Sequence, residues 1–172
     1  MNVTRFDPTI AFTPEELARV RARSDVKGLL CIAHAWLVIG ASMALFALWP
    51  NPLTFVIAVV LIAARQLGLA ILMHDAAHGV LMGTRKWNDS VSQWLAAYPV
   101  FTDTIPYRAY HLVHHRRTQQ PDDPDIGLSA PFPITRASFL RKMIRDITGQ
   151  TGFKQRRAQI RAGLGKPGEQ FA

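Results

Sequence analysis

The 172-residue chain is within the range of one domain, and its apolar content of 49% is high for a soluble protein of that size. Its single cysteine, Cys31, excludes an intrachain disulfide. Lys and Arg outnumber Asp and Glu by 20 to 12, and the resulting charge of +8 suits nucleic acid, anionic lipid or an acidic partner. Because the apolar residues are concentrated between positions 28 and 73, lipid is the simplest of these choices.

The first segment, residues 1–27, is polar and carries a signal for the start of a helix. Thr13 stands as the N-cap, Pro14 opens the first turn and Glu16 completes a capping box, which predicts a short N-terminal helix in the cytoplasm. Residues 28–49 follow without a charged side chain, and as a helix these 22 residues span about 33 Å, against about 30 Å for a bilayer core. This run is too long for the core of a signal peptide, so we expect it to remain as a membrane span.

Pro50-Asn51-Pro52 interrupts the apolar sequence and is too short for anything but a tight turn. The next apolar run, residues 53–73, must therefore return antiparallel to the first, which predicts a transmembrane hairpin. Arg65 lies within this run, where a central position in the membrane would cost about 3 kcal/mol, so we expect it to face protein or the headgroups. Basic residues precede and follow the hairpin but are absent from its turn, so the positive-inside rule predicts a multi-pass protein with both termini in the cytoplasm.

The apolar segments beyond the hairpin are shorter. Residues 91–101 follow Ser90-x-x-Gln93, which has the form of a capping box, and at 11 residues they should lie at the interface or re-enter without crossing. Residues 127–172 form a basic cytoplasmic tail, in which residues 136–147 have the pattern of an amphipathic helix resting on anionic lipid. The tail has few aromatic side chains for stacking on bases, so we expect no nucleic-acid partner.

Five of the six histidines fall in two clusters, HDAAH at residues 74–78 and HLVHH at residues 111–115. Spacings of three and four residues place the imidazoles of each cluster on one face of a helix. Convergent neutral imidazoles predict a transition-metal site that suits iron, zinc or copper, whereas His34, alone in the first span, is expected to be structural. The candidate metal ligands are His74, His78, His111, His114 and His115.

The two clusters resemble the HxxxH and HxxHH boxes of the integral-membrane fatty acid desaturase and hydroxylase superfamily. The run after the second box also resembles the family pattern, with Thr118 followed by Asp123-Pro124-Asp125. The resemblance covers residues 28–126 and includes the order of hairpin, first box, interfacial segment and second box. Either box alone would be a weak pattern, but both in this order are specific.

The resemblance implies an all-α membrane protein in which histidines from three boxes hold two iron ions at the cytoplasmic face. It also implies an activity in which O2 is used to introduce a double bond into an acyl chain, with electrons from a ferredoxin or a cytochrome b5-like donor. Three carboxylates beside the boxes are candidates to orient the imidazoles by accepting their second N–H, namely Asp75, Asp123 and Asp125. For Asp123 and Asp125, capping of the loop is an equal alternative.

The family's third box has no counterpart here, because no histidine follows His115. We therefore expect a truncated form whose di-iron site is incomplete and whose activity is doubtful. Two alternatives stay open. One is hydroxylation or ketolation of a lipid such as a carotenoid, which uses the same boxes; the other is a non-catalytic, metal-binding membrane protein.

Overall fold

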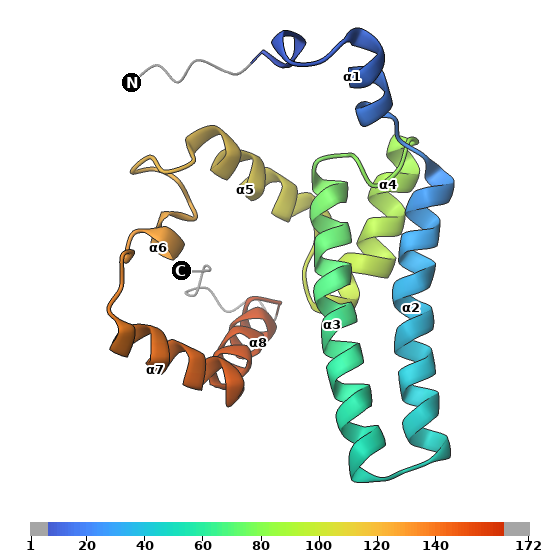
Figure 1. The fold of residues 1–172 in the computed structure, drawn as a ribbon, viewed down its shortest axis with the longest axis vertical. Coiled ribbons are helices and arrows are strands. Elements are labelled where there is room, and N and C mark those ends of the chain that lie inside the picture. Colours follow the sequence, from blue (N-terminus) through green and yellow to red (C-terminus); the bar gives the residue numbers. More distant parts are fainter. Residues whose placement is uncertain (1–6, 164–172) are drawn as a thin grey trace.

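The computed structural model describes residues 7–163 (Figure 1). The outer ends of the predicted N-terminal segment and tail, residues 1–6 and 164–172, lie outside the described residues. All regular structure within the described range is helical, with no strand, so the predicted all-α fold is confirmed.

The chain begins with the helices η1 (Pro8–Ile10) and α1 (Pro14–Arg21). The predicted capping box at α1 is confirmed, because the Thr13 hydroxyl accepts from the backbone N–H of Glu16 at 3.3 Å and the Glu16 carboxylate accepts from the N–H of Thr13 at 2.8 Å. Two of the N–H groups that have no partner inside the helix are thereby satisfied.

The two longest helices, α2 (Asp25–Leu48) and α3 (Pro52–Ala77), form an antiparallel hairpin (Figure 1). Asn51 caps α3 by accepting from the N–H groups of Leu53 and Thr54. The most apolar windows of α2 and α3 have mean hydropathies of 2.1 and 2.4, yet only 17% and 11% of their residues are buried. Such exposure is the opposite of a helix in a soluble core, and it suits contact with lipid.

A second layer lies against the end of the hairpin opposite its turn, where α2 begins and α3 ends (Figure 1). It consists of α4 (Arg85–Ser92), a π-helical turn η2 (Gln93–Ala97) and η3 (Tyr98–Val100), which all pack on α3. The indole N–H of Trp36 in α2 donates to the carbonyl of Leu95 at 2.9 Å and joins this layer to the first helix. Residues 91–101 therefore pack beside the hairpin and end at a left-handed Phe101 without forming a third long helix.

The capping box predicted at Ser90 is wrong, because Ser90 lies inside α4, which begins at Arg85. Thr84 is the N-cap residue instead, and its N–H and hydroxyl bind a residue that is distant in the sequence. Its N–H and hydroxyl donate to the Asp25 carboxylate at 2.9 and 2.6 Å. This pair joins the start of α4 to the start of α2.

The remaining described helices are α5 (Thr104–Arg117), α6 (Ile126–Ser129), α7 (Arg136–Ile147) and α8 (Gln150–Gly163). Asp103 caps α5 by accepting from the N–H of Ile105 at 2.9 Å. The guanidinium of Arg156 holds α8 to the end of the second layer, donating to the Val100 carbonyl at 2.9 Å and lying 4.9 Å from the Phe101 ring centroid. No residue of α7 is buried, so its apolar face remains available for contact with a molecule outside the described part of the chain.

The apolar core lies where α2, α3 and the second layer meet. Residues of the loop between α3 and α4 complete it. Its most buried members are Leu69, Ala76, Met82, Ala96 and Ala97. The core therefore fixes the end of α3 that carries the first histidine cluster.

Candidate metal centre

Four histidines from two helices converge beside this core. His74 lies in the last turn of α3 and His78 is its C-cap residue, while His111 and His115 lie one turn apart on α5. One ring nitrogen from each of the four lies within 4.8 Å of the others. The predicted meeting of the two clusters is therefore present for these four residues, and their role as metal ligands stays a prediction.

The ring nitrogens of this cluster approach one another closely. The Nε2 atom of His111 lies 3.0 Å from Nε2 of His78 and 2.9 Å from Nε2 of His115. One neutral imidazole nitrogen offers either one proton or one lone pair, so it cannot make two good hydrogen bonds of this kind at once. Ligands at right angles, each about 2.1 Å from one ion, lie about 3.0 Å apart, so the spacing fits a shared metal.

The electrostatic environment favours the neutral form of two of these imidazoles, those of His111 and His78. Burial, followed by the neighbouring imidazoles, lowers the pKa of His111 to about 4. The same two causes, burial first, lower the pKa of His78. At neutral pH both rings are therefore uncharged and hold a free lone pair, as coordination to a metal requires.

His114 is placed differently from the other four. Its Nδ1 lies 2.7 Å from a carboxylate oxygen of Asp123 and 3.5 Å from one of Asp125, and it is not part of the group that converges within 4.8 Å. The hydrogen bond with Asp123 raises the pKa of His114. If Nδ1 carries the proton, Nε2 keeps its lone pair, and Asp123 holds the ring in one orientation.

The three candidate carboxylates also differ from one another. Asp123 is buried and accepts from the N–H groups of Gln119 and Asp125, both at 2.9 Å, as well as from His114. Its contacts suit both roles considered from the sequence, loop capping and orientation of an imidazole, and the second role stays a prediction. Asp75 lies 3.4 Å from Nδ1 of His74, which is a weak contact, and Asp125 accepts from the Tyr110 hydroxyl.

Sequence reasoning missed several residues that contact the cluster or the helices that carry it. The Tyr107 ring stacks on His111 with centroids 5.1 Å apart and its hydroxyl lies 3.4 Å from Nδ1 of that histidine. A spacing of four residues on one helix could have identified this tyrosine. Arg108, Asp89 and Asn88 form a polar network at the end of α3, and no local pattern marks them, because the partners are distant in sequence.

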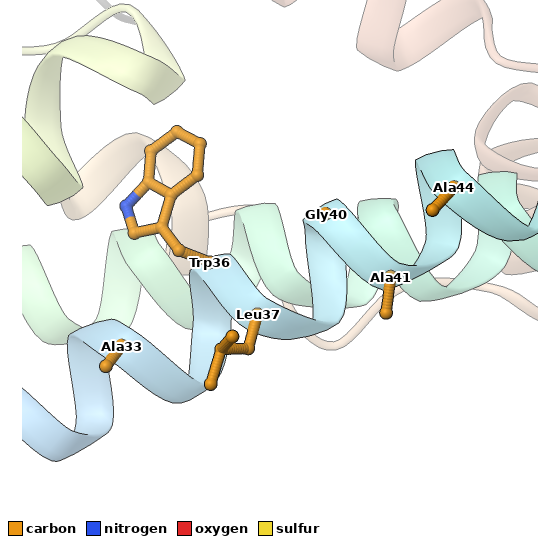
Figure 2. A pocket seen from close by; sticks show the side chains of 6 residues that line it. All are labelled: Ala33, Trp36, Leu37, Gly40, Ala41 and Ala44. Atoms are coloured by element: carbon orange, nitrogen blue, oxygen red, sulfur yellow. The ribbon is translucent and has the colours of Figure 1, made fainter.

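A shallow apolar groove lies elsewhere, along one side of α2 (Figure 2). Small side chains leave it shallow, and the Trp36 ring stands at one end of it. Its lining contains no histidine, so it is separate from the candidate metal centre. The lining residues are Ala33, Trp36, Leu37, Gly40, Ala41 and Ala44.

Comparison with known proteins agrees with this arrangement. The family model for fatty acid desaturases matches residues 50–168, which include both histidine clusters, and the chain belongs to that family. Together with the two long apolar helices, this membership indicates a membrane protein. No solved structure matches the chain significantly.

Two relatives show the range of the similarity. A dihydrorhizobitoxine desaturase from Bradyrhizobium elkanii is 36% identical over 114 residues, which are 65% of this chain and 32% of the relative. A beta-carotene ketolase from Paracoccus sp. (strain PC1) is 35% identical over 112 residues, which are 60% of this chain and 42% of the relative. The chain thus matches about a third of the first relative's length and about two fifths of the second's.

Proposed function

We propose that the chain is part of a membrane-bound, non-haem di-iron oxidoreductase that uses O2 to introduce a double bond into an acyl chain. The observation that carries the proposal is the convergence of four imidazoles from the two boxes at the end of an apolar hairpin. Membership of the desaturase family supports the choice of iron over zinc or copper, which imidazole also suits. Iron bound there would supply the oxidising power needed to remove hydrogen from an unactivated carbon.

In this proposal the protein's residues hold and orient the metal. His74, His78, His111 and His115 would be ligands, and His114 would offer Nε2 while Asp123 fixes its ring. A membrane lipid or other acyl chain would reach the site from the bilayer beside α2 and α3. A ferredoxin or a cytochrome b5-like protein would deliver electrons from the cytoplasm, where we place both boxes and both termini.

A second candidate function is hydroxylation or ketolation of a lipid such as a carotenoid. The similarity to a protein named beta-carotene ketolase favours it, because that relative matches about as well as the desaturase does. A non-catalytic, metal-binding membrane protein is the third candidate. The 172 residues carry two of the family's three boxes, so we propose that on their own they bind metal without turnover.

Metal content tests the site directly. The purified chain should retain iron, and the double variant His111→Ala, His115→Ala should lose most of it, since two of the four converging nitrogens disappear. His34→Ala is the matched control, because His34 is exposed on α2 and should leave the metal content unchanged. Equal iron in the double variant and the wild type would contradict the proposed site.

Product analysis tests the reaction. Acyl chains and carotenoids are compared in cells that express the 172 residues and in cells that express a chain extended by a third box from a relative. New double bonds with the extended chain support desaturation, whereas new hydroxyl or keto groups on carotenoids support the second candidate. Double bonds made by the 172 residues alone would refute the expectation that two boxes do not suffice.

A further inference from the structure

A partly buried arginine joins the two helices that carry the histidine boxes. Arg108 lies on α5, three residues before His111, and its side chain is 13% exposed. Its Nη2 donates to the carbonyl of Ala76 at 2.8 Å, and its Nε donates to the carbonyl of Ala77 at 2.9 Å. These are the last two residues of α3, so an arginine from the second box's helix caps the helix of the first box.

The same guanidinium is held from its other side by α4. Its Nη2 and Nη1 donate to the two carboxylate oxygens of Asp89, at 2.5 and 3.2 Å. The hydrogen bond from Arg108 is the largest cause of a lowered pKa of Asp89, so this carboxyl group is ionised at neutral pH. Two parallel bonds of this type fix the plane of the guanidinium as well as its position.

Asn88, the neighbour of Asp89, completes the network. It is fully buried, and its amide donates to the Ala76 carbonyl at 2.9 Å while its oxygen accepts from the N–H of Met82 at 3.3 Å. The end of α3, the loop that follows it, α4 and α5 therefore meet at one set of hydrogen bonds.

We propose that Arg108, held by Asp89, is a positioning residue that sets the distance between the two histidine boxes. The proposal rests on the proposed metal site. The carbonyls that Arg108 binds belong to residues 76 and 77, between His74 and His78, and Arg108 is one turn from His111. The 3.0 Å approach of His78 to His111 joins α3 to α5, so a shift of either helix end changes the ligand spacing directly.

Lysine cannot replace this arginine. A lysine ammonium is a single point of charge with three donors, whereas the planar guanidinium reaches two carbonyls and a carboxylate in fixed directions. Arg108→Lys therefore keeps the charge, the helix propensity and every histidine, but it removes the fixed geometry. Arg117→Gln is the matched control on the same helix, because Arg117 is 53% exposed and pairs only with the exposed Asp122 among the described contacts.

Cobalt(II) is the probe, since its visible spectrum reports the number and geometry of its ligands. The full chain in lipid nanodiscs is titrated with cobalt for the wild type, Arg108→Lys, Asp89→Asn and Arg117→Gln. We expect affinity to fall about 10- to 100-fold in Arg108→Lys, the range found when groups that support metal ligands are removed, and its spectrum to change. Asp89→Asn should show a smaller change in the same direction, and Arg117→Gln should match the wild type.

A purely structural role would lower the unfolding temperature of Arg108→Lys and leave the cobalt affinity and spectrum of the folded fraction unchanged, and this result would overturn the proposal. Spin labels at Ile71 on α3 and Val113 on α5, which are both exposed, give a readout without metal. In a Cys31→Ser background, their distance distribution should broaden or shift in Arg108→Lys, and an unchanged distribution would also overturn the proposal. If the wild type binds neither cobalt nor iron, the proposed function fails, and the label distance alone then decides whether Arg108 sets the spacing of the helices.

Discussion

Replacing Gly28 by alanine should weaken the fold, although the same change elsewhere in the same helix should not. Gly28 is buried near the start of α2, and a Cβ there would lie 2.4 Å from the Leu81 carbonyl oxygen and 2.8 Å from Cγ of Met82. Side-chain carbons do not approach closer than 3.0 Å, so the backbone at Leu81 must move by at least 0.6 Å, the difference between these two distances. Such overpacking costs about 1–3 kcal/mol.

Gly40→Ala is the matched control, because no atom lies within 4 Å of a Cβ built at that position. Both substitutions gain the same helix propensity, about 1 kcal/mol, so the difference between the two variants isolates the cost of the contact. We expect the free energy of unfolding of Gly28→Ala to lie about 1–3 kcal/mol below that of Gly40→Ala. The measurement is reversible unfolding in mixed micelles followed by helical circular dichroism, and equal stabilities would refute the close approach of α2 to the loop after the first box.

Two further predictions concern the membrane. In a Cys31→Ser background, a cysteine at Asn51 should react with an impermeant thiol reagent from outside the cell and one at Lys86 only from the cytoplasm, and the reverse pattern would contradict the proposed orientation. A spin label at Ile144 in α7 should be shielded from water more strongly in nanodiscs with anionic lipid than with neutral lipid, because each basic residue near such a surface adds about 1 kcal/mol. Added salt should reduce that shielding, a label at Arg141 should remain in water, and equal shielding of Ile144 in both lipids would argue against the lipid contact.

Local signals in the sequence were sufficient where all the interacting groups are close together in the chain. The capping box at Thr13 needs only residues up to Glu16, and the turn at Asn51 needs only its two prolines and Thr54, so the start of α1 and the turn of the hairpin could be predicted. The false capping box at Ser90 has the same pattern. It fails because the helix begins earlier, at its N-cap Thr84, which hydrogen-bonds to Asp25, 59 positions away in the sequence. A short sequence window around Ser90 does not include Asp25.

Helical geometry explains why four of the five predicted imidazoles converge while His114 points elsewhere. At 100° per residue, His115 lies about 40° around α5 from His111, whereas His114 lies about 60° away on the other side. The α3 histidines face His111 and His115, so His114 turns toward the loop that carries Asp123. The pattern HxxHH predicts a shared face, but the position of the partner helix decides which histidines meet.

The Arg108 network could not be predicted by any reading of local patterns. The hydrogen bonds of Arg108 join residues that are 19 to 32 positions apart, and a lone arginine before a histidine box is expected to be a solvated charge. The reason for its burial becomes visible only in three dimensions. The last carbonyls of α3 end beside an apolar core and need donors, and α5 supplies one.

The direction of the two helices adds a last reason for a cation at this place. His74 lies in the last turn of α3, and His114 and His115 lie in the last turn of α5, so both boxes occupy helix C-termini. The carbonyl ends of helices carry a partial negative charge that favours a nearby cation over a neutral or negative group. Arg108 binds the last two carbonyls of α3, and His74 and His78, on either side of them in the sequence, face the second helix. In the function proposed above, this arrangement would place a cation site at the boundary of the membrane, where an acyl chain and a soluble electron donor could both approach it.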